Sequence, residues 1–328
     1  MKLKITDAHE LVRQAMSRFG YDDEQQTIIA DHLIDCSVRG FDVGGLPRAA
    51  TLVERLGRSE PFGPIVVEQE TASSIALDGG DQLGYIVAKQ LTEMLIDKAR
   101  HVPVVAGTAR NTWCTGMFTY YLEMVAEAGL VGFVASSGGP TVAPHGGAEG
   151  RFGTNPVAWG FPTPGQPIIW DIGTSAAMLA DLSFAIKTGQ DLAPGIAFGP
   201  DGTPTTDPAA ALDGGAIAPW GGHKGSGLAI SAQLLGMMSG AEADPSWLTD
   251  MGFFMVVMNP DAFSADFPKR AGEYGDWVRA TKPVDPQSPV RMPFDRSVAT
   301  RDAAMAAGEI DVADEIVKLL RDFVGSPA

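Results

Sequence analysis

Cysteine is scarce in this sequence: Cys36 and Cys114 are the only two among 328 residues. Two cysteines cannot build the disulfide framework of a small secreted protein or a four-thiolate metal site. His32 and Cys36 have the i, i+4 spacing of metal ligands on a helix, but the sequence offers no third ligand in a recognisable pattern. We therefore expect a protein of the reducing cytoplasm that holds no metal.

Positive charge is also in short supply, since 24 lysines and arginines stand against 40 aspartates and glutamates. The resulting net charge of -16 leaves no broad cationic surface for nucleic acid or for an anionic lipid headgroup. We expect no nucleic-acid partner. An acidic small molecule would need a local cluster of cations, such as Arg39, Arg48, Arg55 and Arg58.

Long uninterrupted apolar runs are missing as well. The uncharged segments 130–148 and 152–170 are broken by glycine and proline at a density that a membrane span would not carry. The lysines near the N-terminus precede no apolar run. The sequence predicts neither a membrane span nor a signal peptide.

The usual dinucleotide fingerprint G-x-G-x-x-G is absent. The one G-x-G is Gly225-Ser226-Gly227, and the third glycine position is Ile230. A Walker A sequence is missing too. The sequence therefore predicts no standard Rossmann phosphate loop.

Glycine-rich loops are nevertheless present at 136–147, 171–175 and 221–227. Their backbone N–H groups could cradle a pyrophosphate, although a loop of this kind taken alone is more often just a loop. Lys224 lies at the start of a predicted helix, where the helix dipole disfavours a cation unless an anion binds there too. This position favours an anionic ligand.

Hydrophobic periodicity predicts an α/β fold with a mixed sheet. Helices are predicted at 7–19, 22–38, 48–57, 83–100, 117–128, 176–187 and 224–240, and two more within 296–326. Strands are predicted at 65–80 as a hairpin, and at 102–111, 130–137, 156–162, 167–175 and 251–260. Asp7 and Glu10 are predicted to cap the first helix as a capping box. Residues 1–70 with 285–328 are expected to form a helical domain, and 71–284 a cofactor- and substrate-binding α/β domain.

Four sequence blocks occur in an order that resembles one known family. They are FGTNPVAWGFP (152–162), WDIGTSAA (170–177), DGTPTTDPAAAL (201–212) and GGHKGSGLAI (221–230). Together they resemble the malate/L-lactate dehydrogenase family of the sulfolactate dehydrogenase-like type over nearly the whole chain. The resemblance implies a three-layer α/β fold without a Rossmann domain, an NAD(P)-dependent oxidoreductase, and a homodimer.

The resemblance also implies site residues. Cofactor contacts with NAD or NADP are implied for Ser136, Thr154, Asn155, Asp171, Ile172, Gly173, Thr174, Ser175, His223, Lys224 and Gly225. A small-molecule carboxylate substrate is implied to contact Arg48, Thr112 and Trp113.

The chain departs from the family pattern at the residues that carry the chemistry. The position of the family's catalytic histidine is Gly44, and the position of the aspartate that orients it is Gly199. Such a pair protonates the developing alkoxide when hydride reaches a ketone. Weak replacement candidates for the acid are Asp42, Cys114 and His145.

The double absence has two interpretations. The first is a redox enzyme with a different substrate: most simply a cyclic imino acid, whose C=N bond is protonated before it binds and needs no protein acid, or else an unusual 2-oxo or 2-hydroxy acid. Family members that reduce cyclic imino acids keep the histidine, so this chain would differ from them. The alternative is a non-redox protein on the same scaffold, either a lyase, a hydrolase or a ligand-binding protein.

Overall fold

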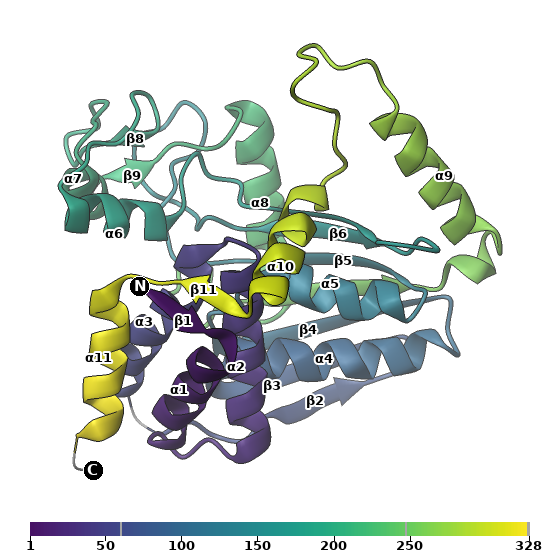
Figure 1. Cartoon of the computed structure of the whole chain (residues 1–328), viewed down its shortest axis with the longest axis horizontal. Helices are drawn as coiled ribbons and strands as arrows, with labels where there is room; N and C mark the ends of the chain where they lie inside the picture. The colour runs from purple at the N-terminus through teal and green to yellow at the C-terminus, as the bar shows by residue number, and fades with distance from the viewer. Residues whose placement is uncertain (60, 247, 327–328) are drawn as a thin grey trace. The chain divides into compact units, whose positions relative to one another are not determined.

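A computed structural model describes residues 1–59, 61–246 and 248–326 of the chain (Figure 1). The chain divides into two units: residues 1–62 with 273–328, and residues 63–272. The α/β class with a mixed sheet is confirmed. The predicted domain boundaries at 70 and 285 lie close to these edges, and the assignment of cofactor and substrate to one domain stays a prediction.

The first unit joins the two ends of the chain. Strand β1 (Lys2–Lys4) pairs antiparallel with β11 (Glu309–Asp311), and the purple and yellow segments of Figure 1 lie side by side there. The helices of this unit are α1 (Ile5–Ser17), α2 (Asp23–Val38), α3 (Leu46–Leu56), α10 (Asp295–Ala307) and α11 (Asp314–Gly325), with a 3-10 turn at Asp42–Gly44. Helices α10 and α11 are the two closing helices that the sequence predicts.

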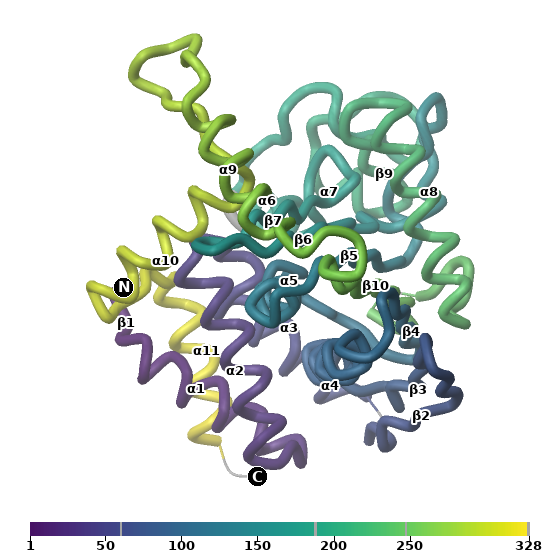
Figure 2. Tube along the Cα trace, turned by 90° about the vertical axis from the view of Figure 1, so that its right-hand side faces the viewer, coloured from purple at the N-terminus to yellow at the C-terminus, as the bar shows by residue number. Residues whose placement is uncertain are grey.

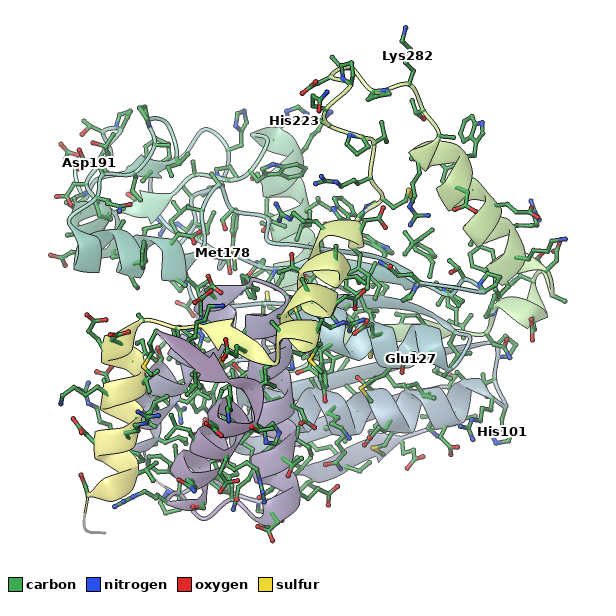
Figure 3. The ribbon with its side chains drawn as sticks, in the orientation of Figure 1. His101, Glu127, Met178, Asp191, His223 and Lys282 are labelled. Carbon is green, nitrogen blue, oxygen red and sulfur yellow. The ribbon has the colours of Figure 1, made fainter. Side chains whose placement is uncertain are left out.

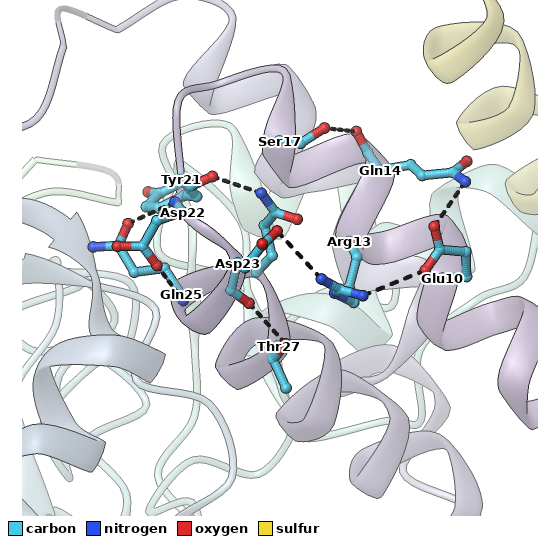
Figure 4. A network of polar contacts seen from close by, with 10 residues as sticks. Glu10, Arg13, Gln14, Ser17, Tyr21, Asp22, Asp23, Gln25 and Thr27 are labelled. Atoms are coloured by element: carbon cyan, nitrogen blue, oxygen red, sulfur yellow. Dashed lines mark hydrogen bonds and ion pairs between the residues drawn. The ribbon is translucent and has the colours of Figure 1, made fainter.

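The predicted capping box of the first helix is wrong. Because β1 holds residues 2–4 extended, α1 begins at Ile5, and Asp7 already lies in its first turn. The capping box belongs to α2, where Asp22 accepts from the Gln25 N–H at 2.8 Å and the Gln25 side chain accepts from the Asp22 N–H at 3.1 Å (Figure 4).

The second unit is built on a seven-stranded sheet with the order β2-β3-β4-β10-β5-β6-β7. Strands β3 and β4 are parallel, and the other neighbouring pairs are antiparallel, with β2 and β3 forming the predicted hairpin. The strands are β2 (Val66–Glu70), β3 (Ser74–Leu83), β4 (Val104–Trp113), β5 (Val131–Ser136), β6 (Val157–Phe161), β7 (Ile168–Ile172) and β10 (Phe253–Met258). Strand β10, late in the sequence, completes the sheet between β4 and β5.

Helices cover the two faces of this sheet unequally. Figure 2 shows α4 (Gly84–Ala99) and α5 (Phe118–Glu127) on one side of the strands and α8 (His223–Met238) on the other. Gly132 and Gly160 are cross-strand partners beneath α5, and a Cβ at either would lie within 3 Å of Leu122. The two glycines therefore allow α5 to pack closely on β5 and β6.

A smaller layer of the same unit packs beside α8. It contains α6 (Leu179–Thr188), β8 (Ala197–Phe198), α7 (Pro208–Leu212) and β9 (Ala216–Ile217). Its core includes Val142, Phe152, Leu182 and Ala229, the last on α8. A 3-10 turn (Pro260–Ala262) and helix α9 (Phe267–Arg279) follow β10, and hydrophobic periodicity predicts neither of them. Within the described residues, no helix has the length and apolar character needed to cross a bilayer.

Candidate functional site

Hydrogen bonds bring the three predicted cofactor segments together. The Thr174 N–H and hydroxyl both donate to the Thr154 carbonyl, at 2.9 and 3.0 Å. The Thr174 carbonyl in turn accepts from the Trp220 N–H at 2.8 Å, just before α8. Thr174, which is fully buried, therefore joins the segment after β7 both to the segment before β6 and to the start of α8.

The neighbouring predicted residues lie around this junction. Ser136 is buried at the end of β5, and its N–H donates to the Pro156 carbonyl at 3.2 Å. Ser175 donates its hydroxyl to the Ala177 carbonyl at 2.7 Å. A Cβ on Gly173 would lie 2.9 Å from the Met178 sulfur, so the backbone passes close to that side chain. Ile172 packs beside the cluster of Ala135, Val157 and Ala232.

Asn155 presents an unsatisfied acceptor in these loops. Its side-chain amide donates to the Ala229 carbonyl and to Gln233 Oε1, both at 2.8 Å. Its Oδ1 atom is buried and has no hydrogen-bond partner among the described residues. A buried acceptor without a partner costs roughly 1–3 kcal/mol, so a ligand that supplies a donor here would be stabilised. The backbone of Asn155 has a φ of 34°, which is uncommon for a residue other than glycine.

The start of α8 is suited to an anion. Gly221 and Gly222 have φ values of 60° and 65°, and a Cβ on Gly225 would lie 1.8 Å from the Trp220 carbonyl oxygen. Only glycine therefore fits the turn that exposes the first N–H groups of the helix. His223 and Lys224 are exposed at this end, and Figure 3 labels His223 there.

Two histidines flank this helix start. The rings of His145 and His223 are 6.1 Å apart, and the His145 N–H donates to the Ser226 hydroxyl at 3.0 Å. The helix dipole and the Lys224 charge give a local positive field in a strongly acidic chain. Together with the glycine turn and the Asn155 acceptor, these residues fit a phosphate-bearing dinucleotide.

Asp171 lies on the opposite face of the sheet from these groups. Its carboxylate accepts from the Thr119 N–H at 2.9 Å and from the Thr119 hydroxyl at 3.2 Å, at the start of α5. Burial raises the pKa of this carboxyl from 3.8 to about 6, and the hydrogen bonds from Thr119 and Phe118 limit the rise. The observed contacts hold α5 on the sheet, and a cofactor contact of Asp171 stays a prediction.

The first unit contains Gly44 and Arg48. Gly44 is buried in the 3-10 turn, and a Cβ there would lie 2.3 Å from Cε1 of the Phe41 ring. The Phe41 ring therefore fills the space that a side chain at position 44 would need. Arg48 lies in the first turn of α3 and is partly buried, while Glu54 on the same helix pairs with Arg58 at 3.0 Å.

Gly199 lies just after β8, in the second unit. A Cβ at this position would be 3.2 Å from Asp201 Oδ1. That same oxygen accepts from the Thr203 N–H and hydroxyl, at 3.0 and 2.7 Å. Asp201 is exposed and caps this turn through these hydrogen bonds, which lower the pKa of its carboxyl.

The three residues considered as replacements for the catalytic acid have different surroundings. Asp42 and His145 are exposed, whereas Cys114 is partly buried with its sulfur 3.3 Å from the Tyr85 hydroxyl. Cys114 has a φ of 59°, which for a residue other than glycine indicates local strain. Nothing in the sequence pattern points to Tyr85 as its neighbour, because Tyr85 lies on a different element, α4.

Thr112 and Trp113, the predicted substrate contacts, are both fully buried at the end of β4. The Thr112 hydroxyl donates to the Gln82 carbonyl at 2.8 Å, and the Trp113 indole N–H donates to the Asp81 carbonyl at 3.1 Å. Both bonds fix the parallel β3–β4 pair, and their contact with substrate stays a prediction.

The spacing of His32 and Cys36 does not produce a metal site in the described part of the chain. Both side chains are fully buried, and burial, followed by the nearby Arg39 charge, lowers the pKa of His32 to about 3. Among the described residues, no three histidine, cysteine, aspartate or glutamate side chains gather as a metal would require.

Comparison with known proteins identifies similar chains. The model of the malate/L-lactate dehydrogenase family matches residues 3–321. The L-sulfolactate dehydrogenase of Methanocaldococcus jannaschii is 30% identical over 298 residues, covering 87% of this chain and 86% of its own. The Delta(1)-pyrroline-2-carboxylate/Delta(1)-piperideine-2-carboxylate reductase of Pseudomonas syringae pv. tomato is 30% identical over 333 residues, which cover 96% of this chain and 94% of the reductase. The solved structure of a dehydrogenase from Sinorhizobium meliloti superposes with a TM-score of 0.92 at 29% identity. The superposition covers 99% of this chain and 98% of the dehydrogenase.

The raised pKa of Asp171 predicts a pH dependence of stability. The folded state binds the proton of the Asp171 carboxyl more tightly than the unfolded state does. The resulting stabilisation of the folded state is full below pH 3.8 and is lost as pH rises through about 6. Asp171→Asn keeps an oxygen for Thr119 and cannot ionise. It should reduce the loss of unfolding free energy between about pH 4 and 7 by up to about 3 kcal/mol.

Urea unfolding at several pH values measures this effect. Asp213→Asn, at an exposed aspartate, is the matched control and should keep the wild-type pH profile. A wild-type pH profile in Asp171→Asn would contradict the assignment of a buried, protonatable carboxyl.

Proposed function

Since this chain belongs to the malate/L-lactate dehydrogenase family, we propose that it transfers hydride between a nicotinamide cofactor and a carbon next to a carboxylate. It is an oxidoreductase of that family, whose dehydrogenases depend on nicotinamide in general. The observation that carries the proposal is the junction at Thr174, which joins three cofactor segments beside the anion-suited start of α8.

The proposed cofactor is NAD or NADP, which when bound supplies or accepts the hydride. Gly222, His223 and Lys224 would hold its phosphates with backbone N–H groups and positive charge. The orphaned Asn155 oxygen would accept a hydrogen bond from the cofactor or from an ordered water beside it. Thr174 and Ser175 keep the loop in place through their own backbone partners.

The proposed substrate is a small carboxylate with a C=N bond, such as a cyclic imino acid. Arg48 would bind the carboxylate, because a guanidinium offers two parallel N–H donors to it. Hydride added to the carbon of a protonated C=N bond leaves a neutral amine, so the step takes no proton from the protein. The absence of a side chain at Gly44, with Phe41 in its place, supports this class. The name of the Pseudomonas relative, a pyrroline- and piperideine-carboxylate reductase, also supports it.

A second candidate is an unusual 2-oxo or 2-hydroxy acid. It would require a relocated acid, and the hydrogen-bonded pair of Cys114 and Tyr85 is the observation that favours it. For either substrate we propose a homodimer, as the family resemblance implies, and, from the cysteine content, the charge and the apolar pattern, a cytoplasmic protein with no nucleic-acid or membrane partner.

Cofactor binding can be tested on its own by calorimetry with NADH and NADPH. We expect at least one to bind with micromolar affinity, and Lys224→Ala to weaken that binding about tenfold, equivalent to ~1.4 kcal/mol. Lys282→Ala removes an exposed lysine of the other unit and should leave the affinity unchanged. Failure of both cofactors to bind at millimolar concentration would refute the cofactor proposal.

The substrate class can be tested by comparing reduction of Δ1-piperideine-2-carboxylate with that of pyruvate. Loss of a general acid typically costs ~10²–10⁴ in rate, so the imine should be reduced at least about 100-fold faster than the ketone. Arg48→Ala should weaken imine binding by roughly 100-fold, since a hydrogen bond to a charged group contributes up to ~3 kcal/mol.

Arg100→Ala is the matched control for that variant. Arg100 is exposed, follows α4 and pairs with Asp97, so its loss should leave the kinetics unchanged. Equal efficiency on pyruvate and imine in the wild type would contradict the substrate class. Unchanged kinetics with a lower melting temperature in Arg48→Ala would assign Arg48 a structural role.

A further inference from the structure

Helix α5 begins without a cap from its own sequence. The residue before it is Met117, whose side chain makes no capping hydrogen bond to the helix. The first N–H groups of a helix have no partner inside the helix, and a polar side chain usually supplies the acceptor. Phe118 and Thr119, the first two helical residues, are both buried, so water cannot easily replace such an acceptor. The start of α5 therefore requires an acceptor from another element.

Asp171 of β7 supplies this acceptor. Its carboxylate accepts from the Thr119 N–H at 2.9 Å and from the Thr119 hydroxyl at 3.2 Å, and the Phe118 N–H also bonds to it. The helix dipole favours an anion at this end of the helix. Asp171 lies three residues before Thr174, which joins the proposed cofactor segments. The start of α5 is thus tied to the strand that leads into the proposed cofactor loop.

Helix α5 in turn holds the loop that precedes it. This loop, residues 114–117, directly follows the two predicted substrate contacts at the end of β4. Tyr121, in the first turn of α5, donates its hydroxyl to the Thr115 carbonyl at 2.6 Å, and both residues are buried. Cys114 has a φ of 59°, and a residue other than glycine keeps such a conformation only where its surroundings hold it. The loop therefore depends on the position of α5.

We propose that Asp171 is a positioning residue for hydride transfer. Its carboxylate fixes the start of α5, Tyr121 of that helix fixes Thr115, and the loop held in this way sets where the substrate lies relative to the cofactor. The inference rests on the proposed function, because it names the residue that aligns the two reactants proposed there. Asp171 acts through α5 and does not contact the reacting atoms. A displacement of about 1 Å costs roughly 100-fold in rate, so such alignment matters.

The kinetics of Δ1-piperideine-2-carboxylate reduction test this role. They are measured at about pH 8, where the Asp171 carboxyl, with its pKa of about 6, is ionised. We expect Asp171→Ala to lower kcat by about 10- to 100-fold, while the Kd of the reduced cofactor and the KM of the imine stay within about threefold. Asp171→Asn keeps an oxygen that can accept from Thr119 and should restore most of the lost kcat. Tyr121→Phe, which removes one hydroxyl, should lower kcat at unchanged cofactor affinity.

The loop can also be followed without cofactor or substrate, through the thiol of Cys114. The other cysteine, Cys36, is fully buried, so labelling by the thiol reagent DTNB reports on Cys114. Loss of a helix cap shifts a local equilibrium about fivefold, so Asp171→Ala should be labelled about fivefold faster than the wild type. Tyr121→Phe should also be labelled faster. Because both changes act through α5, the rate in the double variant should stay below the product of the two increases.

Asp22→Ala is the matched control. Asp22 caps α2 in the first unit by accepting from the Gln25 N–H at 2.8 Å, so this variant removes a cap of the same kind without a change at α5. It should leave kcat, the cofactor Kd and the rate of Cys114 labelling at their wild-type values, even where it lowers the melting temperature.

Three results would overturn the proposal. A wild-type kcat in Asp171→Ala or in Tyr121→Phe would leave these residues a purely structural role. A weakened cofactor affinity with kcat preserved would place the Asp171 carboxylate on the cofactor. A wild-type rate of Cys114 labelling in Asp171→Ala would separate Asp171 from the loop. Failure of the wild type to bind either reduced cofactor or to reduce the imine would instead refute the proposed function, and it is seen before any variant is compared.

Discussion

The proposed cofactor site depends on the hydrogen bonds made by Thr174. This buried residue ties its own N–H and hydroxyl to the Thr154 carbonyl and accepts from the Trp220 N–H. Together with the bonds from the Asn155 amide to Ala229 and Gln233, these hydrogen bonds join the segment after β7, the Asn155 region and α8. With them, a chain that lacks the usual glycine fingerprint still directs backbone N–H groups and a lysine to one place.

Gly44 and Gly199, where the resemblance implies the family's acid and its partner, are each packed against a neighbouring side chain. Phe41 fills the space beside Gly44, and the Asp201 carboxylate next to Gly199 is taken by Thr203. The space beside each glycine is therefore occupied by a neighbouring side chain, Phe41 at Gly44 and Asp201 at Gly199. The proposed substrate arrives already protonated, so hydride transfer to it would need only the cofactor and a carboxylate anchor.

Much of this arrangement could be predicted from sequence, because glycine turns and apolar periodicity are local signals. The sheet strands and α8 follow from such patterns. The insertion of β10 between β4 and β5 could not be predicted, since strand order depends on contacts far apart in sequence. The early start of α1 depends on the distant β11, and the direction of Asp171 toward Thr119 depends on the pleat of β7. The filling of the Gly44 space by Phe41 and the pairing of Cys114 with Tyr85 likewise appear only in three dimensions.

The central claim is that hydride transfer proceeds here without a proton from the protein. Single-turnover reduction of Δ1-piperideine-2-carboxylate by the reduced cofactor, run in H₂O and in D₂O, tests it most directly. The account predicts a slower step with cofactor deuterated at the transferred position and nearly equal rates in the two solvents. A marked slowing in D₂O that disappears in Cys114→Ala would contradict it, because a proton would then move from a protein group in the same step.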